Sequence, residues 1–247
     1  MERIDDLNLN GKKILQDTEC FLFGMDSVLL ANMVKENGKV IVDLGTGSAV
    51  MPVIISEKTN GNKIIGVELQ DEMYNLATKN VEYNNLEECI YIYHGDIKNV
   101  ESIRKYIKEK VGKDKVDVVI SNPPYKEVGT GSVNDTTVKY IARHEVKCNL
   151  EDIFKTSAKL LKSKGKLYLV HKPERLVDLM CLARKYNLEA KKIRFMQPVK
   201  NKKPSIVLVQ YVLNGGKECI VAPVTIEYDE NGNYTKEILD IYGMNNE

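Results

Sequence analysis

The sequence is organised around the stretch VDVVISNPPY, which spans Val116–Tyr125. Its first half is apolar and β-branched, which is typical of a strand buried on both faces of a parallel sheet. Pro123 and Pro124 must end that strand, because neither can donate a hydrogen bond to a neighbouring strand and each restricts the residue before it. The stretch therefore predicts a rigid turn at the carboxyl end of a strand, where open α/β sheets place their ligands.

Strand and helix patterns alternate on both sides of this stretch. Strands are expected at residues 39–43, 64–68, 90–94, 116–121, 166–171, 190–197 and 205–213. Helices are expected at residues 26–34 with Asp26 or Ser27 as N-cap, around Pro52, and at residues 71–83, 102–111, 150–162 and 173–186. This alternation predicts an α/β fold with one doubly wound, mostly parallel, seven-stranded sheet and helices on both faces.

The ends of the chain are expected to pack on the same domain. Residues 3–17 alternate apolar and polar side chains around Asn10-Gly11, which predicts a hairpin. We therefore expect one domain over residues 1–247, in which a hairpin and helix at 1–37 pack on a core at 38–247. Residues 126–140 lack periodicity and predict a loop, Gly165 is expected to end the preceding helix, and the tail at 220–242 is expected to add an edge strand.

The composition is that of an ordinary globular protein, with 43% hydrophobic and 29% charged residues among 247. The 36 basic residues nearly balance 35 acidic ones, so net charge alone does not indicate a nucleic-acid-binding protein. The five cysteines are scattered and form no C-x-x-C pair, which predicts reduced thiols without zinc. No signal peptide or membrane-spanning run is visible, so a cytoplasmic enzyme without metal is expected.

A second motif, DLGTG at residues 43–47, follows the first strand of the core and precedes a helix. Gly45 and Gly47 let a ligand approach the bare backbone, and the helix N-terminus beyond them adds partial positive charge. A dinucleotide fingerprint requires a third glycine three residues after Gly47, but Val50 occupies that position. The loop therefore predicts a cofactor-binding turn and argues against an NAD-dependent dehydrogenase.

Three acidic residues, Asp43, Glu68 and Asp96, end three successive strands. Parallel strands present their carboxyl ends at one edge of the sheet, so these carboxylates are expected to face one ligand. Glu68 would accept both ribose hydroxyl groups, and Asp96 would accept from an adenine amino group. The set favours S-adenosylmethionine, an adenosyl ligand without phosphates, although carboxylates at strand ends also occur as helix caps or turn residues.

The side chains at the proline turn suit a planar substrate that carries an amino group. Asn122 offers an amide oxygen, Pro123 a carbonyl group of fixed direction, and Tyr125 an aromatic ring that can stack on a base. The lone pair of an exocyclic amine is delocalised into its ring, so the amine is a poor nucleophile. Two oxygen acceptors would draw the nitrogen toward tetrahedral geometry and stabilise the positive charge that develops during methyl transfer.

These motifs together resemble a known family. The matching segments are FGMDSVLLA (Phe23–Ala31), DLGTG (Asp43–Gly47), GVELQ (Gly66–Gln70), GDI (Gly95–Ile97), NPPY (Asn122–Tyr125), ARHE (Ala142–Glu145) and VHKPERL (Val170–Leu176). In this order they resemble the bacterial tRNA(Val) adenine-N6 methyltransferases. The resemblance implies a class I methyltransferase, Rossmann-like fold and transfer of a methyl group from S-adenosylmethionine to the adenine 3′ of the anticodon of tRNA(Val).

The resemblance and the motifs together assign candidate site residues. The catalytic candidates are Asn122, Pro123 and Tyr125. The cofactor-binding candidates are Asp43, Gly45, Thr46, Gly47, Glu68, Leu69, Asp96, Ile97 and Asn122. The RNA-binding candidates are Arg143, Lys172, Arg175, Lys200, Lys202 and Lys203, of which the last three are equally well interpreted as a solvated charged turn. The expected partner is tRNA, and the enzyme is expected to be a monomer without a bound metal.

Three other functions are compatible with these residues. Protein glutamine N5-methyltransferases use the same Asn-Pro-Pro-Tyr motif, but only about forty residues precede Asp43, too few for the helical domain typical of that family. An rRNA guanine-N2 methyltransferase would favour Phe over Tyr125. The non-enzymatic alternative is an RNA-binding module that holds S-adenosylmethionine without transferring its methyl group.

Overall fold

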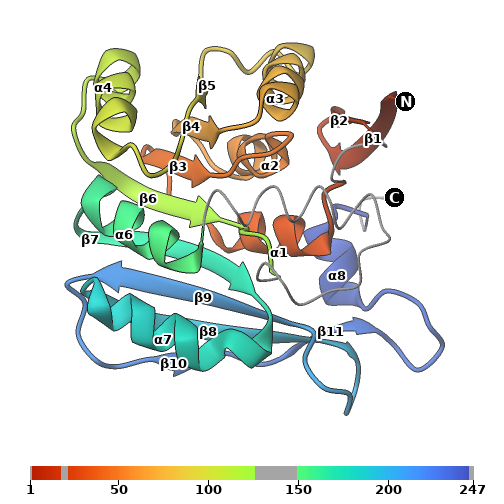
Figure 1. Cartoon of the computed structure of the whole chain (residues 1–247). Helices are drawn as coiled ribbons and strands as arrows, with labels where there is room; N and C mark the ends of the chain where they lie inside the picture. The colour runs from red at the N-terminus through yellow and green to blue at the C-terminus, as the bar shows by residue number, and fades with distance from the viewer. Residues whose placement is uncertain (1, 18–21, 126–148, 245–247) are drawn as a thin grey trace, which may run out of the picture.

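A computed structural model describes residues 2–17, 22–125 and 149–244 (Figure 1). The elements in chain order are β1 (Glu2–Leu9), β2 (Lys12–Asp17), α1 (Met25–Met33), β3 (Val40–Leu44), α2 (Val50–Lys58), β4 (Lys63–Glu68), α3 (Asp71–Tyr83), β5 (Ile90–His94), α4 (Val100–Val111), β6 (Val116–Ser121), α6 (Leu150–Leu160), β7 (Leu161–His171), the 3-10 turn η1 (Pro173–Arg175), α7 (Leu176–Lys185), β8 (Leu188–Val199), β9 (Ile206–Leu213), β10 (Ile220–Val221), β11 (Thr225–Tyr228) and α8 (Lys236–Ile241). The loop expected at residues 126–140 lies outside the described residues.

The central sheet has the strand order β10-β8-β9-β7-β6-β3-β4-β5, and β11 also pairs with β8. β3 to β7 run parallel to one another, whereas β9 runs antiparallel to both β7 and β8. The seven strands from β3 to β9 correspond to the seven expected from the sequence. The tail adds two short parallel strands at the β8 edge and the helix α8, so the described sheet has nine strands.

Apolar side chains on both faces of the sheet form two layers of core. α1, α2, α3 and α8 contribute to one buried cluster, and α4, α6 and α7 contribute to the other (Figure 1). Along β3, Ile41 belongs to the first cluster, whereas Val40 and Val42 belong to the second. Successive side chains of a strand point to opposite faces, so the unbroken apolar run of β3 reflects burial on both sides.

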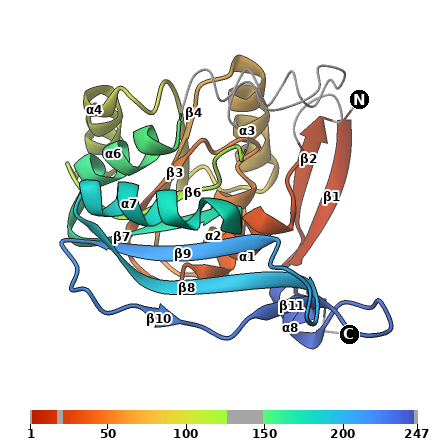
Figure 2. The same cartoon turned by 60° about the horizontal axis from the view of Figure 1, so that its bottom comes forward.

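The N-terminal hairpin β1–β2 forms a separate two-stranded sheet beside α3 (Figure 2). Two asparagines bind the hairpin to α3. They are Asn80 on the helix and Asn84 at its C-terminal end, one helical turn apart. Asn80 accepts from the Leu15 amide at 2.7 Å and donates to the Leu15 carbonyl at 3.0 Å, and Asn84 makes the same pair of bonds with Lys13 at 3.0 and 2.7 Å. The two amide side chains therefore supply hydrogen-bond partners to backbone groups at the edge of β2, where no neighbouring strand does so.

Gly165 does not end the preceding helix as expected. α6 stops at Leu160, and Leu161 already pairs with Val116 in the sheet. The register then shifts, so that Lys166 pairs with Val118 and the intervening residues form a bulge. A Cβ atom at Gly165 would lie 2.8 Å from the Lys162 carbonyl oxygen, so glycine is needed here for close packing of the bulge.

Candidate active site

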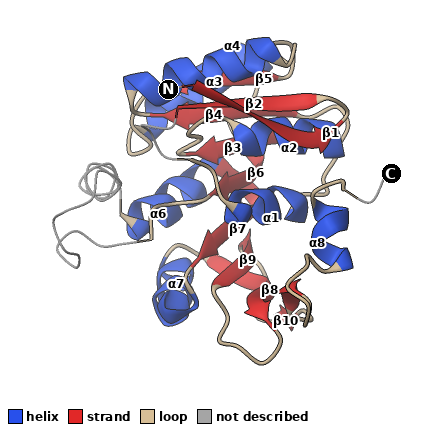
Figure 3. Cartoon of the chain, turned by 90° about the vertical axis from the view of Figure 1, so that its right-hand side faces the viewer, coloured by secondary structure: helices blue, strands red, loops and turns tan. Residues whose placement is uncertain are grey.

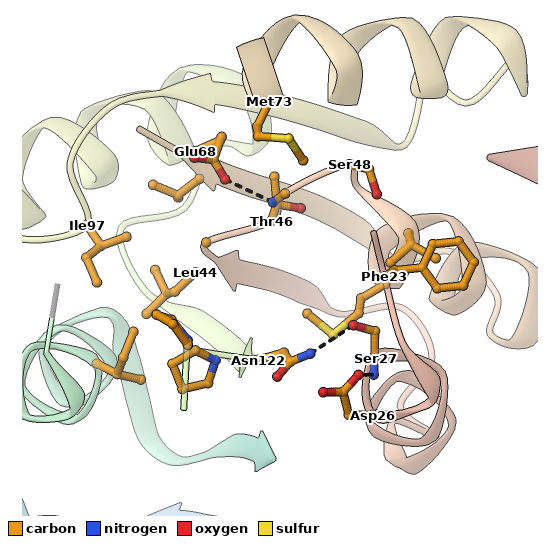
Figure 4. A pocket seen from close by; sticks show the side chains of 18 of the residues that line it. Phe23, Asp26, Ser27, Leu44, Thr46, Ser48, Glu68, Met73, Ile97 and Asn122 are labelled. Atoms are coloured by element: carbon orange, nitrogen blue, oxygen red, sulfur yellow. Dashed lines mark hydrogen bonds between the residues drawn. The ribbon is translucent and has the colours of Figure 1, made fainter. Parts of the chain in front are cut away.

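A cavity of about 760 Å³ opens at the carboxyl ends of β3, β4 and β6 (Figure 4). Its size falls in the range of roughly 300–1,000 Å³ typical of small-molecule sites. The sequence-predicted residues that line it are Gly45, Thr46, Gly47, Glu68, Leu69, Asp96, Ile97, Asn122, Pro123, Tyr125 and Lys172. The structure therefore brings the glycine loop and the proline turn to one cavity, although they lie on different strands.

The glycine loop turns sharply between β3 and α2. Gly45 and Gly47 have φ angles of 77° and 57°, in the left-handed region that residues with a Cβ atom rarely adopt. The amides of Gly45 and Thr46 both donate to the Val67 carbonyl, at 2.9 and 3.0 Å. These bonds hold the loop against the end of β4 and leave its backbone facing the cavity.

Glu68 fixes the other side of that loop. One carboxylate oxygen accepts from the Gly47 amide at 3.0 Å, and the other accepts from the amides of Leu69 and Gln70 at 2.9 Å each. The side chain is only 5% exposed but lines the cavity. Because each carboxylate oxygen has two lone pairs, Glu68 keeps acceptor capacity for a ligand hydroxyl group.

Asp43, which the sequence assigns to the cofactor site, does not line the cavity. Its side chain is fully buried beneath the loop and accepts a hydrogen bond from the Thr46 hydroxyl at 2.8 Å. Its second oxygen has no hydrogen-bond partner in the described part of the chain. Burial, with a smaller contribution from nearby Glu68, raises the pKa of Asp43 to about 7. The geometry makes Asp43 a support for the loop.

Asp96 and Ile97 form the part of the wall that follows β5. The Asp96 carboxylate accepts from the Lys98 amide at 2.8 Å and also lines the cavity. Ile97 is buried and provides an apolar surface next to it. A carboxylate beside an apolar side chain suits a flat heterocycle that carries an amino group, as the sequence predicts for adenine.

At the proline turn, the first turn of α1 holds both functional side chains. Asn122 donates from Nδ2 to the Ser27 hydroxyl at 2.9 Å, which leaves Oδ1 as its remaining polar atom (Figure 4). The Tyr125 hydroxyl contacts Asn122 Oδ1 at 3.0 Å and forms a second, short hydrogen bond with Asp26. Burial and the Asp26 carboxylate raise the pKa of Tyr125 far above its usual value, so the phenol keeps its proton.

This arrangement corrects one sequence assignment. Neither Asp26 nor Ser27 is the N-cap of α1, because both lie inside the helix and Gly24 precedes it. The Ser27 amide donates instead to the Gly24 carbonyl at 3.2 Å and to Asp26 Oδ1 at 2.9 Å. The two side chains face the cavity because their partners are on the proline turn.

The Tyr125 ring has neighbours that bear on the predicted stacking of a base. The Lys172 ammonium lies 5.1 Å from the ring centroid, within cation–π range, and also donates to the Ser205 carbonyl at 3.3 Å. The His171 ring lies 5.2 Å away and is tilted by 56°. A base that stacks on the face covered by Lys172 must displace that side chain. Burial and Arg175 lower the pKa of His171 to about 4, so this ring is neutral at pH 7.

The remaining basic candidates lie outside the cavity wall. Arg175 pairs with Asp178 at 2.6 Å. Lys200, Lys202 and Lys203 are exposed on the turn between β8 and β9. That turn leads into Ser205, which lines the cavity, so it occupies the same edge of the sheet. Arg143 lies outside the described residues.

Several lining residues are not among the candidate site residues that the sequence assigns. They are Phe23, Asp26, Ser27, Leu44, Ser48, Val50, Met51, Val67, Gln70, Met73, Pro124, Ile153, Glu174 and Ser205. Phe23, Asp26 and Ser27 belong to the FGMDSVLLA segment that marks the family resemblance, which was the available signal. The same signal was available for Leu44, Val67, Gln70, Pro124 and Glu174, which lie in the other matching segments. The remaining residues lie in none of these segments, and no sequence pattern separates them from the core; they are Ser48, Val50, Met51, Met73, Ile153 and Ser205.

No group of three or more His, Cys, Asp or Glu side chains within residues 2–17, 22–125 and 149–244 is arranged to hold a metal ion. No helix among those residues has both the length and the apolar character needed to cross a bilayer.

Curated relatives point to one activity. The chain is 24% identical over 203 residues to the tRNA1(Val) (adenine(37)-N6)-methyltransferase of Porphyromonas gingivalis, covering 80% of this chain and 77% of the relative. It is also 24% identical over 230 residues to the enzyme of the same name from Flavobacterium johnsoniae, covering 92% and 93% of the two chains.

Solved structures support the fold. A predicted O-methyltransferase from Agrobacterium tumefaciens superposes with a TM-score of 0.67 at 20% identity, covering 89% of this chain and 97% of that one. The sheet order and this similarity confirm the expected methyltransferase fold. The family model described as methyltransferase small domain matches residues 25–187, which include the glycine loop, Glu68 and the proline turn. The chain belongs to the methyltransferase small domain family.

Proposed function

We propose that this enzyme uses S-adenosylmethionine to methylate the N6 amine of an adenine in tRNA, at the position 3′ of the anticodon of tRNA(Val). The observation that carries the proposal is the placement of Asn122 at one cavity with the glycine loop and Glu68. The names of the curated relatives support the RNA substrate and the base. A cytoplasmic location fits this substrate.

The residues at the loop end fit an adenosyl cofactor. The exposed backbone of Gly45 and Gly47, the Glu68 carboxylate and the pair Asp96 and Ile97 offer a surface for the amino acid, ribose and adenine groups respectively. When bound, S-adenosylmethionine supplies an electrophilic methyl group on a positively charged sulfur. The missing third glycine matters little for such a ligand, because it has no pyrophosphate to place against the backbone.

The residues at the proline turn act on the amine. Asn122 Oδ1 and the Pro123 carbonyl accept the two amine hydrogens and turn the nitrogen lone pair out of the base plane. As the nitrogen gains positive charge, these fixed dipoles stabilise it without any strong base. The amine proton leaves afterwards to solvent. Holding the two reactants in contact supplies much of the remaining rate enhancement.

The basic residues at the same edge are proposed to contact RNA phosphates. Lys172 lines the cavity, and Lys200, Lys202 and Lys203 are exposed on the adjoining turn. If Lys200 contacts a phosphate, Lys200→Ala reduces by about 1 the slope of log affinity against log salt. Lys63→Ala is the matched control, because Lys63 is the exposed first residue of β4, at the opposite end of the strands from the cavity. Equal slopes for the two variants and the wild type would remove Lys200 from the RNA contact.

The proposal is tested by identifying the methylated product. A tRNA(Val) transcript is incubated with the protein and S-adenosylmethionine, digested to nucleosides and analysed by mass spectrometry. N6-methyladenosine is expected, and it should be absent from a transcript whose adenine 3′ of the anticodon is replaced by guanine. N2-methylguanosine, or methylation of a protein release factor in place of tRNA, would identify one of the alternative activities.

A further inference from the structure

The first turn of α1 and the proline turn form one hydrogen-bonded group of four side chains. Asn122 reaches Ser27 across 95 positions of sequence, and Tyr125 reaches Asp26 across 99. All four residues line the cavity. Ser27 is 5% exposed, so its contact with Asn122 is shielded from solvent.

The Ser27 contact holds the Asn122 amide nitrogen against the first turn of α1. The amide carries a donor nitrogen and an acceptor oxygen of nearly equal size, so its orientation follows from its partners. Ser27 Oγ lies 2.9 Å from Nδ2, and the Ser27 hydroxyl proton is free to point elsewhere. This contact leaves Oδ1 as the atom available to an incoming amine.

The Tyr125 hydroxyl has a single proton and two acceptors within reach among the described residues, Asp26 Oδ2 and Asn122 Oδ1. A carboxylate accepts a stronger hydrogen bond than a neutral amide does, because the bond is charge-assisted. Asp26 lies in the first turn of α1, where the helix dipole favours negative charge, and it also accepts from the Ser27 amide. The phenol proton therefore belongs to the bond with Asp26.

We propose that Asp26 and Ser27 are positioning residues that prepare Asn122 for the substrate amine. Ser27 holds the amide nitrogen of Asn122, and Asp26 accepts the hydrogen bond of the Tyr125 hydroxyl, so that Tyr125 does not donate to Oδ1 before the substrate arrives. A bond donated by Tyr125 to Oδ1 would occupy one of its two lone pairs and weaken the acceptor on which charge stabilisation depends. The inference rests on the proposed function, because it concerns the acceptor for a reacting amine.

The test is a double-mutant cycle of Asp26→Asn and Tyr125→Phe, measured as kcat for methylation of the tRNA(Val) transcript. In the Tyr125 background, Asp26→Asn replaces the carboxylate with a neutral amide, so the Tyr125 hydroxyl can donate its hydrogen bond to Asn122 instead. We expect kcat to fall about 10-fold, which corresponds to the free energy of one hydrogen bond. In the Phe background no hydroxyl exists to compete, so Asp26→Asn is expected to change kcat less than about 2-fold. The affinity for S-adenosylmethionine and the melting temperature are followed in parallel.

The cycle separates positioning from a merely structural contribution. If Asp26 only stabilises α1, its replacement lowers kcat by the same factor in both backgrounds, and its role as the acceptor for the Tyr125 hydroxyl is wrong. A loss confined to KM for the tRNA would also overturn it. If the wild-type protein makes no N6-methyladenosine, the proposed function fails and this inference falls with it. If the wild-type protein is active and the effects of the two substitutions are additive, the inference is wrong and the proposed function is unaffected.

A second variant tests the contact with the amide. Ser27→Ala removes the acceptor for Nδ2 and lets the Asn122 amide rotate, so kcat is expected to fall about 10-fold with unchanged affinity for S-adenosylmethionine. Ser56→Ala on α2 is the matched control, because Ser56 bonds only to the Val53 carbonyl among described residues and does not line the cavity. Equal kcat values for the two variants would exclude Ser27 from positioning.

Discussion

The two ends of the cavity are built in different ways. At the loop end, Glu68 binds the amides of Gly47, Leu69 and Gln70, and its most distant partner is 21 positions away. At the proline turn, the side chains of Asn122 and Tyr125 are held by α1, from 95 and 99 positions away. Figure 3 shows α1 beside the ends of β6 and β7, in the middle of the molecule. The glycine loop and Glu68 thus lie within a short segment, whereas the placement of Asn122 and Tyr125 depends on long-range contacts.

Replacing the Asn122 amide, the proposed acceptor for the substrate amine, should have the largest effect. Asn122→Asp removes the Nδ2 donor to Ser27 and places a second carboxylate near Asp26, so the two carboxylates repel each other and the group no longer presents a neutral acceptor. We expect kcat for tRNA methylation to fall about 100- to 1,000-fold, as for loss of one preorganised dipole in other active sites. The affinity for S-adenosylmethionine, measured by calorimetry, should change much less. An equally large loss of affinity for S-adenosylmethionine would show that the proline turn and the glycine loop do not act independently.

Removing the carboxylate at the loop end should act on the cofactor. Glu68→Ala leaves three backbone amides without their acceptor and removes the predicted ribose contact. Because hydrogen bonds to charged groups contribute roughly 1.5–3 kcal/mol, the dissociation constant for S-adenosylmethionine should rise about 10- to 100-fold. The dissociation constant of Glu68→Gln, which keeps one carbonyl oxygen, should lie between those of the wild type and Glu68→Ala. Cofactor affinity that matches the wild type would exclude Glu68 from the binding site.

Packing beneath the glycine loop should matter less but measurably. A Cβ atom at Gly66 would lie 2.8 Å from two atoms of the Thr46 side chain, so Gly66→Ala must displace the loop. We expect a loss of about 1–3 kcal/mol in the free energy of unfolding, measured by urea denaturation. Gly216→Ala meets no atom within 4 Å and is the control, with an expected change within about 0.5 kcal/mol. Equal changes in the two variants would show that the loop accommodates the methyl group.

The buried support of the loop should be detectable through the pH dependence of stability. The folded-state pKa of Asp43 is about 7 and its ordinary value is 3.8, so the folded chain binds this proton more tightly than the unfolded chain. The stability due to this group is therefore greatest at low pH and decreases as pH rises from about 4 to about 7. Asp43→Asn removes the titration and can keep the acceptor for Thr46. Its melting temperature relative to the wild type should increase between pH 5 and pH 8.

Asp117 provides a control of opposite sign. Burial opposes the shift, but hydrogen bonds from Lys162 and from the Val40 amide hold the pKa of Asp117 below its usual range. The stability contributed by Asp117 is present at neutral pH and is lost as pH falls below about 4. Asp117→Asn should therefore lower the melting temperature at pH 7 more than at pH 3. A pH-independent difference for Asp43→Asn would contradict its raised pKa.

The strand positions could be predicted because each strand carries its own signal. The middle parts of β3, β4 and β6 are mostly apolar, as burial on both faces requires, and the bounds of these strands differ by at most one residue from those expected. The bounds of β7 could not be predicted, because the bulge at Gly165 arises from packing against β6. The two short tail strands depend on pairing with β8 more than on their own composition.

The alternating sheet, the glycine loop with Glu68 and the proline turn with Asn122 can be predicted from sequence, because each is specified by residues adjacent in the chain. The position of Asp43 beneath the loop, and the contacts of Asp26 and Ser27 with Tyr125 and Asn122, are visible only in the folded structure. The physical reason is that burial and side-chain hydrogen bonds are set by which elements meet in space. The contacts between α1 and the turn after β6 join residues 95 and 99 positions apart, so no local sequence pattern reveals them.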